Sequence, residues 1–338
     1  RGALDDEGAI VGMLEAVESL LEEGCGPAPT VVFAFGHDEE IGGGEGAKAM
    51  AEQLKAQGKE FSFIIDEGMT IVEPELLPVV PRPLALVGIS EKGHVDIRIT
   101  AEGTSGHSST PPSSTTAGAV ARAVCRVEDN PFSFRMTEPV EELFSTLAPY
   151  SKGLHRFVLS RPRFFSPFLV RMLLREPNGN AMVRTTQAVT MLEGSSKENV
   201  LPSTSSAVVN CRILPGDTLD TVVERIRRII GNPELIVEPI PHLMGNDPLP
   251  VSATDGEGYV LISHAVSEVY PEAVVAPSLV LGTTDSRHYA MLGENIYRFV
   301  PLRLNGELLG TIHGRNERVP VGDFAKAVEV YRSLIGKL

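Results

Sequence analysis

Two short apolar runs with a helical stretch between them constrain the fold of this chain more than any other feature. The runs are Thr30–Phe35 and Phe61–Ile65, and both are continuous in apolar residues, which is typical of strands buried on both faces. Residues 45–57 between them are expected to form a helix. A strand, helix, strand order predicts a parallel α/β sheet.

The residues before and after this unit indicate a helix and then a change of domain. Residues 6–22 place apolar side chains on one helical face, and Gly24 follows as a stop signal. From His94 onward, apolar and polar residues alternate, as in a strand with one face in water. Because 338 residues exceed the size at which one core keeps growing, we expect a second domain to begin here.

The expected second domain has a recognisable order of elements. After the strand at His94 we expect a helix at 115–126, strands near 183–193 and 205–213, a helix over 219–230 and a strand near 234–239. The order βαββαβ is the ferredoxin-like arrangement. Beyond residue 242 the pattern is helix, strand and helix, which indicates a return to the first sheet. We therefore expect residues 1–92 and 242–338 to form one domain, and residues 93–241 to be inserted into it.

One segment, residues 131–180, does not fit the six-element count. It interleaves apolar side chains with arginines in an otherwise acidic protein, including Phe157, Phe164, Phe165, Phe168, Arg156, Arg161, Arg163, Arg171 and Arg175. The apolar stripe predicts a helical excursion that packs on the second domain. Contact with a membrane surface or with a fatty acyl substrate is the alternative.

Charge and hydropathy limit the partners. A net charge of −14 and a pI near 5.1 argue against nucleic acid, since phosphate binding needs a basic surface. No run approaches the roughly 18–20 consecutive apolar residues that a membrane span requires. We expect a soluble protein and favour the cytoplasm, although a targeting sequence upstream of Arg1 stays open.

Acidic residues follow both apolar runs. Glu39–Glu40 and Asp66–Glu67 adjoin glycines at the end of a predicted strand, where ligands bind in α/β sheets. Such a pair, taken alone, is most often solvated surface. Carboxylates that converge in a cleft repel one another, however, so a cation is needed to hold them. With His313 as a nitrogen ligand, the set has the mixed character that zinc accepts.

Six motifs occur in the order and approximate spacing of one family: Arg1–Gly8, His37–Gly43, Asp66–Gly68, Gly106–Ser108, Gly282–Arg287 and Ile312–Glu317. With them the chain resembles the co-catalytic zinc family of carboxypeptidase S, aminoacylase-1 and succinyl-diaminopimelate desuccinylase. It is most similar to the carboxypeptidase S branch, which includes N-fatty-acyl-amino-acid hydrolases. The resemblance implies a zinc-peptidase-like α/β/α sandwich with an inserted ferredoxin-like lid and dimerisation domain.

The resemblance also implies a reaction and its metal ligands. The reaction is hydrolysis of a peptide or amide bond next to a free carboxylate, with two zinc ions per subunit. Asp5 matches the carboxylate that bridges both zincs, and Glu40 and His313 complete one site. The other zinc takes an acid from Asp66–Glu67, of which we favour Glu67 and keep Asp66 open.

Four further residues match catalytic or substrate-binding positions of the family. Glu39 matches the general base, left uncoordinated to move a proton. His107 resembles the histidine that reaches across a dimer to support the tetrahedral oxyanion, although a histidine satisfied within a loop is the plain alternative. Arg287 matches the clamp on the substrate carboxylate, a role suited to a bidentate guanidinium, and Asn199 matches a residue near the substrate. A homodimer through the inserted domain is therefore expected.

One family motif does not occur in this sequence. Family members carry an upstream His-x-Asp whose histidine binds the metal on the Glu67 side, whereas only four residues precede Asp5 here. We expect the sequence to be part of a longer enzyme; the alternative is a shortened protein with one impaired zinc site. A deacetylase or desuccinylase of a polar N-acyl amino acid, and a non-catalytic dimeric scaffold, stay open as other functions.

Overall fold

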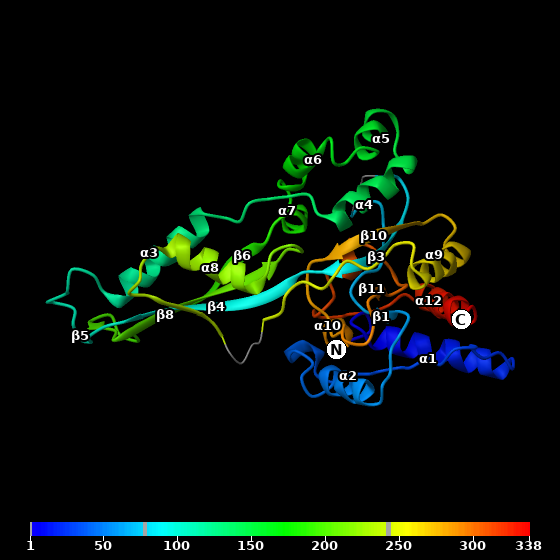
Figure 1. Ribbon diagram of the computed structural model, residues 1–338, viewed down its shortest axis with the longest axis horizontal. Coiled ribbons are helices and arrows are strands. Elements are labelled where there is room, and N and C mark those ends of the chain that lie inside the picture. The colour runs from blue at the N-terminus through cyan, green and yellow to red at the C-terminus, as the bar shows by residue number, and fades with distance from the viewer. Residues whose placement is uncertain (1, 77–79, 241–244) are drawn as a thin grey trace.

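The computed structural model describes residues 2–76, 80–240 and 245–338, which are built around two β-sheets that follow one another along the longest axis (Figure 1). The two helices expected first are confirmed as α1 (Glu7–Glu22) and α2 (Ala47–Ala56). Within the described residues, we find no helix that is both long enough and apolar enough to cross a membrane.

The larger sheet has six strands: β1 (Ile64–Asp66), β2 (Ile71–Val72), β3 (Leu84–Glu91), β10 (Val274–Val280), β11 (Ile296–Arg298) and β12 (Arg303–Leu304). β10 runs parallel to β3, β1 to β11 and β12 to β2. However, β2 and β11 run antiparallel to β3. The expectation of a parallel sheet was therefore wrong in part, because β3 pairs in parallel with β10 but antiparallel with both β2 and β11.

The expected strand over Thr30–Phe35 is absent from the structure. Its residues adopt no regular structure, and Val32, Phe33 and Phe35 are 40%, 36% and 42% exposed. A strand is stabilised by the ladder to a neighbour and by cross-strand side-chain pairs. No described strand pairs with these residues, so their apolar character alone does not make a strand.

Helices cover both faces of the six-stranded sheet, as the α/β/α expectation requires. Successive residues of β3 point to opposite faces. Ala85, Val87 and Ile89 pack with α1, α9 (Glu257–Val269) and α12 (Val321–Ile335), while Leu84 and Leu86 pack with α4 (Glu138–Leu147) on the other side. The predicted return to the first sheet after residue 242 is confirmed by α9, β10 and α12.

The second sheet has four antiparallel strands in the order β6-β8-β4-β9: β4 (Gly93–Glu102), β6 (Thr186–Glu193), β8 (Thr204–Ile213) and β9 (Ile236–Pro239). Helices α3 (Thr116–Asp129) and α8 (Leu219–Ile230) cover one face of it. The order βαββαβ is therefore present. Along β4, Val95, Ile97 and Ile99 are buried while the residues between them are half-buried, which confirms the alternation read from the sequence.

The chain passes from β3 directly into β4 at Lys92, so the six-stranded sheet ends where the four-stranded sheet begins. The expected return boundary between residues 241 and 242 falls among residues that the structure does not describe. Gly231 ends α8 with φ 54°, a left-handed conformation that glycine adopts without steric cost.

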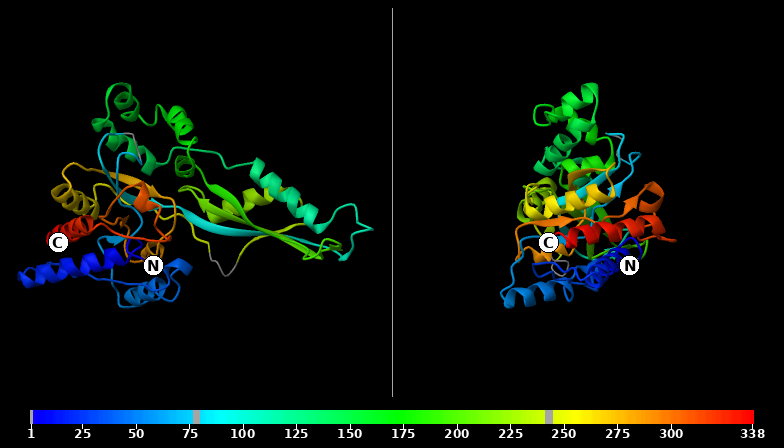
Figure 2. Two further views of the ribbon diagram at one scale, coloured as in Figure 1. Left: turned by 180° about the vertical axis from the view of Figure 1, so that it is seen from behind. Right: turned by 90° about the vertical axis from the view of Figure 1, so that its right-hand side faces the viewer.

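The segment 131–180 is helical, as expected, with α4, η2 (Ala148–Tyr150), α5 (Gly153–Leu159), α6 (Ser166–Leu173) and α7 (Pro177–Val183). Its packing differs from the expectation. Leu143 and Leu147 of α4 fill the face formed by Leu84, Leu86 and Val274, so the excursion rests on the six-stranded sheet (Figure 2). The apolar stripe is buried only in part, since Leu159 and Leu169 are buried whereas Phe157, Phe164 and Phe168 are exposed, and it does not specify the partner surface.

Candidate active site

Asp5, Glu40 and His313 form a compact cluster at one end of the six-stranded sheet. Each offers a ligand atom, and these atoms lie within 4.8 Å of one another. His313 Nε2 lies 3.3 Å from Glu40 Oε1 and directly contacts Asp5 Oδ2. No other group of this kind occurs in the described part of the chain. Two carboxylates and one imidazole are a donor set that fits a divalent metal with an open position.

The three residues come from distant parts of the chain. Asp5 precedes α1, Glu40 lies in the short helix η1 (Glu39–Ile41), and His313 lies in the turn after α11 (Gly306–Leu309). Glu317 joins two of these segments: its Oε1 accepts hydrogen bonds from the backbone N–H groups of Leu4, at 2.7 Å, and Asp5, at 3.1 Å. The sequence offered one signal for this residue, since it ends the Ile312–Glu317 motif.

The turn that carries His313 has an unusual backbone. His313 has φ 57° and Asn316 has φ 65°, both in the left-handed region that residues other than glycine seldom adopt. Such conformations persist where surrounding structure holds them, often at functional sites. Here the carboxylate of Glu317, which is fixed by the N–H groups before α1, supports the turn.

A glycine-containing loop presents Glu39 and Glu40. The carboxylate of Asp38 accepts hydrogen bonds from Glu45 N at 2.7 Å and Gly46 N at 2.9 Å, and so closes the loop. Gly43 has φ 66°, and a Cβ there would lie 2.0 Å from Asp285 Oδ1. Only glycine allows the loop to approach Asp285 this closely, so packing explains the glycine at position 43.

Glu39 lies beside the cluster and lines the adjoining cavity. Burial raises the pKa of its carboxyl to about 7, and the negative charges of Asp285, Glu40 and Asp5 act in the same direction. The guanidinium of Arg287 opposes them. Glu39 thus has the position and the basicity of a proton carrier, and it is not part of the three-residue cluster.

Asp66 and Glu67 do not lie in equivalent places. Glu67 lines the cavity, where Asp6 is its hydrogen-bond partner, and burial together with the charges of Asp66 and Asp6 raises the pKa of Glu67. Asp66 ends strand β1 and is outside the cavity lining. Neither is within the cluster of Asp5, Glu40 and His313.

Arg287 lines the same cavity from α10 (Ser286–Tyr289). Its Nη2 donates a hydrogen bond to the Gly42 carbonyl oxygen at 2.9 Å, and His288 Nε2 lies 2.9 Å from the same oxygen. The Glu39–Glu40 loop and the arginine are therefore held against each other. A substrate carboxylate bound at Arg287 would lie next to the acidic cluster.

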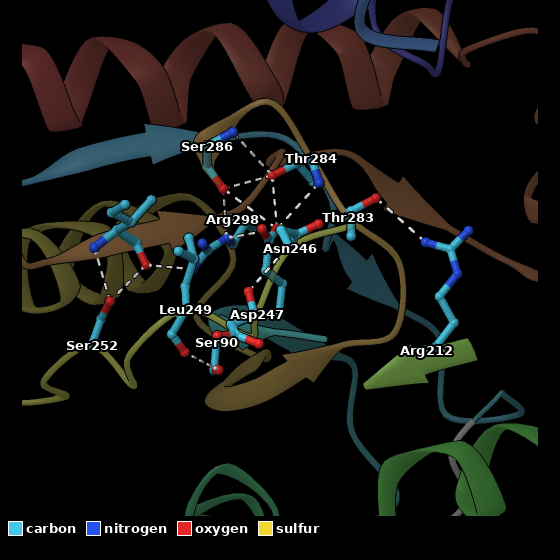
Figure 3. A network of polar contacts seen from close by, with 12 residues as sticks. Ser90, Arg212, Asn246, Asp247, Leu249, Ser252, Thr283, Thr284, Ser286 and Arg298 are labelled. Atoms are coloured by element: carbon cyan, nitrogen blue, oxygen red, sulfur yellow. Dashed lines mark hydrogen bonds and ion pairs between the residues drawn. The ribbon is translucent and has the colours of Figure 1, made fainter. Parts of the chain in front are cut away.

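A buried polar network fixes the turn before α10 (Figure 3). Glu91 Oε2 accepts from the Thr284 N–H at 3.2 Å and from its hydroxyl at 3.0 Å. Arg298 Nε lies 3.5 Å from the same oxygen and donates to Ser286 Oγ at 3.0 Å. Glu91 and Arg298 are both 0% exposed, so their opposite charges compensate each other without water. The network holds the turn that leads into α10 and so positions Arg287. Glu91 and Arg298 themselves do not line the cavity.

His107 and Asn199 lie far from this cluster. His107 lies in a small two-stranded antiparallel sheet of β5 (Gly106–His107) and β7 (Val200–Leu201), and Asn199 directly precedes β7, at the opposite end of the molecule (Figure 1). Ser108 N donates to the Asn199 carbonyl oxygen at 3.1 Å. Neither residue lines the cavity. Ser109 N donates to His107 Nδ1 at 3.2 Å, and Ser109 Oγ lies 2.9 Å from the same nitrogen, so the ring is held through Nδ1.

The cavity next to the cluster has a volume of about 1870 Å³, well above the roughly 300–1,000 Å³ of ordinary ligand pockets. Its polar end contains Asp5, Glu39, Glu40, Arg287 and His313. The rest is lined by apolar side chains from the sheet and the helical excursion, among them Met69, Leu86, Leu143, Phe144, Leu147, Val158, Leu159, Leu169, Leu173 and Met182. A ligand with a long apolar group and a polar end would fit this shape.

Sequence reasoning did not identify two further lining residues. Arg212 on β8 and His94 on β4 are paired across the sheet and both face the cavity. Arg212 Nη1 donates to Thr283 Oγ1 at 3.4 Å (Figure 3). The available signal was that both are polar residues in strands of alternating pattern. Such a pattern does not reveal that the polar face of the four-stranded sheet meets the six-stranded sheet.

Comparison with known proteins gives a consistent assignment. Residues 1–337 match the family described as Peptidase family M20/M25/M40. The chain is 36% identical to the probable carboxypeptidase S-like 2 of Dictyostelium discoideum, covering 99% of this chain and 64% of that protein. It is 37% identical to the N-fatty-acyl-amino acid synthase/hydrolase PM20D1 of Xenopus tropicalis, covering 99% of this chain and 65% of that protein.

A solved structure agrees in fold. The M20 family metallo-carboxypeptidase Sso-CP2 from Sulfolobus solfataricus superposes with a TM-score of 0.66 at 16% identity, covering 99% of this chain and 76% of that one. The chain thus spans slightly less than two thirds of the two curated relatives and about three quarters of the solved chain.

Proposed function

This chain belongs to peptidase family M20/M25/M40, and from that premise we propose that the complete protein hydrolyses an amide or peptide bond next to a free carboxylate. The observation that carries the proposal is the continuity of three features in one cavity. These are the Asp5–Glu40–His313 cluster, the guanidinium of Arg287 and a long apolar lining.

Asp5, Glu40 and His313 would hold one zinc ion, and Glu67 would contribute to a second that shares Asp5. The donor set supports this, since nitrogen and carboxylate oxygen ligands suit zinc. When bound, the metal would supply Lewis acidity for the scissile carbonyl and for the attacking water. The convergence of five acidic side chains at the polar end, Asp5, Asp6, Glu39, Glu40 and Glu67, supports a cationic occupant.

The residues of the chain would carry the remaining steps. Glu39, next to the ligands but outside their cluster, would take the proton of the attacking water and deliver it to the leaving nitrogen. Arg287 would bind the free carboxylate of the substrate and so fix the amide beside the cluster. Its hydrogen bond to Gly42 O ties it to the loop that carries Glu39, which supports concerted placement of both residues.

The apolar lining favours an N-acyl amino acid with a long acyl chain. A polar acetyl or succinyl group would leave most of the roughly 1870 Å³ cavity unfilled. The relative from Xenopus tropicalis is named an N-fatty-acyl-amino acid synthase/hydrolase, which supports the same substrate class. Hydrolysis and condensation share a transition state, so the cavity serves either direction.

We also propose that residues 1–92 and 242–338 form the catalytic domain and residues 93–241 a lid and dimerisation domain. The two separate cores, one on each sheet, support this division. Homodimerisation through the four-stranded sheet would bring His107 and Asn199 of one subunit toward the cavity of the other. Their distance from the cluster in their own chain supports a role in trans.

A series of N-acyl amino acids that differ in acyl-chain length tests the proposed substrate class. Purified complete protein is supplied with zinc and assayed on N-acyl glycines or phenylalanines with acyl chains from acetyl to oleoyl. We expect kcat/KM to rise with chain length, by up to about fourfold per buried methylene at 0.8 kcal/mol each. Highest activity on acetyl or succinyl derivatives would contradict the long-chain assignment. Absence of hydrolysis for every substrate in the series would contradict the proposed hydrolase activity.

A further inference from the structure

Helices α5 and α6 carry an apolar surface at the outer edge of the molecule. Its exposed members are Leu154, Phe157, Phe164, Phe168 and Met172, at 75%, 50%, 78%, 60% and 41% exposure, and we call them the α5–α6 patch. Side chains this large are rarely so exposed together unless they contact something. Figures 1 and 2 show α5 and α6 projecting beyond both sheets.

The patch is surrounded by positive charge. Residues 150–175 contain no Asp or Glu but have six exposed basic residues, Lys152, Arg156, Arg161, Arg163, Arg171 and Arg175, of which Arg163 is paired with Glu141 of α4, in a protein of net charge −14. The Arg161 guanidinium lies 4.6 Å from the Phe157 ring centre. On α6, Arg171 follows Phe168 by three positions and so lies on the neighbouring part of the helix surface, while Arg175 follows Met172 in the turn after the helix.

The aromatic rings are held in place. Phe165 is half-buried, and its ring centroid lies 5.5 Å from that of Phe157 and 4.9 Å from that of Phe164, both edge to face. Such pairs are worth about 0.5–1.5 kcal/mol beyond area burial. The exposed rings are therefore presented on a supported platform and are not loose side chains.

The patch is continuous with the cavity. Leu154, Phe168 and Met172 are exposed to solvent and also line the cavity that reaches the acidic cluster. The occupant of the patch must therefore present apolar groups beside negative charge. A bilayer that contains anionic lipids has this chemistry: interfacial binding scales with buried apolar area and with attraction between basic residues and acidic headgroups.

We propose that the α5–α6 patch docks on the surface of an anionic membrane and that the cavity opens toward the bilayer. The docking rests on the patch alone, while transfer of an acylated substrate from the bilayer into the cavity rests on the proposed function. Phe164 and Leu154 enter the headgroup region, and the arginines around them contact lipid phosphates and carboxylates.

Vesicle binding of the complete protein tests the docking. Sedimentation is measured with phosphatidylcholine vesicles and with vesicles containing phosphatidylserine, at low and high salt. We expect binding to the anionic vesicles that weakens with salt, and a loss of roughly fivefold in partition coefficient for each of Arg156→Gln and Arg171→Gln. Phe164→Ser and Leu154→Ser should weaken it as well, whereas Val321→Ser, at an equally exposed valine on α12, should not.

Fluorescence locates the contact. The printed chain has no tryptophan, so Phe164→Trp and the control Val321→Trp each add a known probe. Emission of the probe at 164 should shift to shorter wavelength on anionic vesicles, and the probe at 321 should not respond. A probe at 164 that is already shielded from a soluble quencher before lipid is added would show that another segment or a second copy covers the patch, and would overturn the proposal.

Two variants separate docking from catalysis. Glu39→Gln should bind vesicles as the unsubstituted protein does, even if no hydrolysis is found in any variant. Phe164, which does not line the cavity, should be dispensable for hydrolysis of a short, water-soluble N-acyl amino acid. Absence of binding to anionic vesicles, or binding unaffected by all patch substitutions, would contradict docking whatever the activity.

Discussion

Asp66 and Glu67 are adjacent in the chain, but their carboxylates lie in different surroundings. Glu67 lines the cavity and has Asp6 as its hydrogen-bond partner. Asp66 faces the buried network, where Arg298 and Thr284 favour its ionised form although burial raises its pKa. Of the two acids that the sequence left open, only Glu67 lines the cavity, so we propose Glu67 as the metal ligand.

This difference predicts opposite effects of two similar substitutions. Glu67→Gln in the complete, zinc-loaded protein should lose one metal equivalent and lower activity by at least roughly 100-fold, since even supporting residues of a metal site change affinity by about 10–100-fold. Asp66→Asn should keep both metals but lower the free energy of unfolding by about 1–3 kcal/mol, because the amide cannot replace both carboxylate oxygens as acceptors from Thr284 and from the backbone N–H groups of Glu67 and Ser286. Metal analysis and thermal unfolding of both variants check this; the reverse pattern would make Asp66 the ligand.

Glu317 is predicted to act through Asp5. Its carboxylate accepts hydrogen bonds from the backbone N–H groups of Leu4 and Asp5. Glu317→Ala should leave these donors without this partner and weaken zinc binding by roughly 10–100-fold. Glu317→Gln keeps an acceptor oxygen and should restore most of the affinity. Zinc titration of the metal-free protein measures the affinity of each variant. Glu307→Ala, at an exposed glutamate beside the same turn, serves as control, and equal effects at both positions would exclude a positioning role.

Lys92 is predicted to make stability depend on pH. It is fully buried, with its Nζ donating to the carbonyl oxygens of Ala181 and Arg184 at 3.0 Å and 2.9 Å. Burial, assisted by the charge of Arg212, lowers the pKa of its ammonium to about 7. An unfolded lysine titrates near pH 10.4, so between these values the unfolded state binds more protons and the free energy of unfolding rises with pH.

The comparison that isolates this effect is with Lys92→Met. The difference in unfolding free energy, unsubstituted minus variant, should increase between about pH 7 and pH 10 by at most about 1.4 kcal/mol per pH unit. Below about pH 7 both states are protonated and the difference should be constant. Chemical denaturation across this range measures it, and parallel curves would show that Lys92 is not desolvated.

The sequence predicts those elements whose formation depends on local periodicity alone, and it fails where an element depends on a tertiary neighbour. Residues 6–22 and 219–230 have strong helical periodicity, and the alternation from His94 marks β4, so these elements were predicted correctly. Residues 30–35 are equally apolar but form no strand, because strand formation needs a neighbouring ladder that local composition does not specify. The apolar stripe of residues 131–180 likewise predicted helices, but neither the exposure of Phe157, Phe164 and Phe168 nor the packing of α4 on the larger sheet.

The candidate site shows the same division. Asp5, Glu40 and His313 were selected from three distant motifs, and the structure brings them together. Glu317 was not selected, because its partners are backbone N–H groups that leave no trace in the sequence. Glu91 and Arg298 are fully buried charges, and only the tertiary structure shows that they compensate each other and hold the turn before Arg287.

His107 is predicted to act on the cavity of a partner subunit. Mixing inactive His107→Ala with inactive Glu39→Gln subunits should restore about a quarter of full activity, since random exchange of a twofold dimer gives half mixed dimers with one complete site each. Activity assays before and after subunit exchange measure it. If mixed dimers form, as shown by differential labelling, but stay inactive, His107 does not act in trans.

The central claim is that a metal held by Asp5, Glu40 and His313 and a proton carrier at Glu39 together hydrolyse an N-acyl amino acid. The most direct test measures metal content and hydrolysis of a long-chain N-acyl amino acid for the complete protein and for Glu39→Gln. We expect unchanged metal content and a loss of roughly 10²–10⁴-fold in kcat for the variant, the contribution typical of a general base. Loss of metal from the variant would instead make Glu39 a ligand, and retained hydrolysis would contradict its role as the proton carrier.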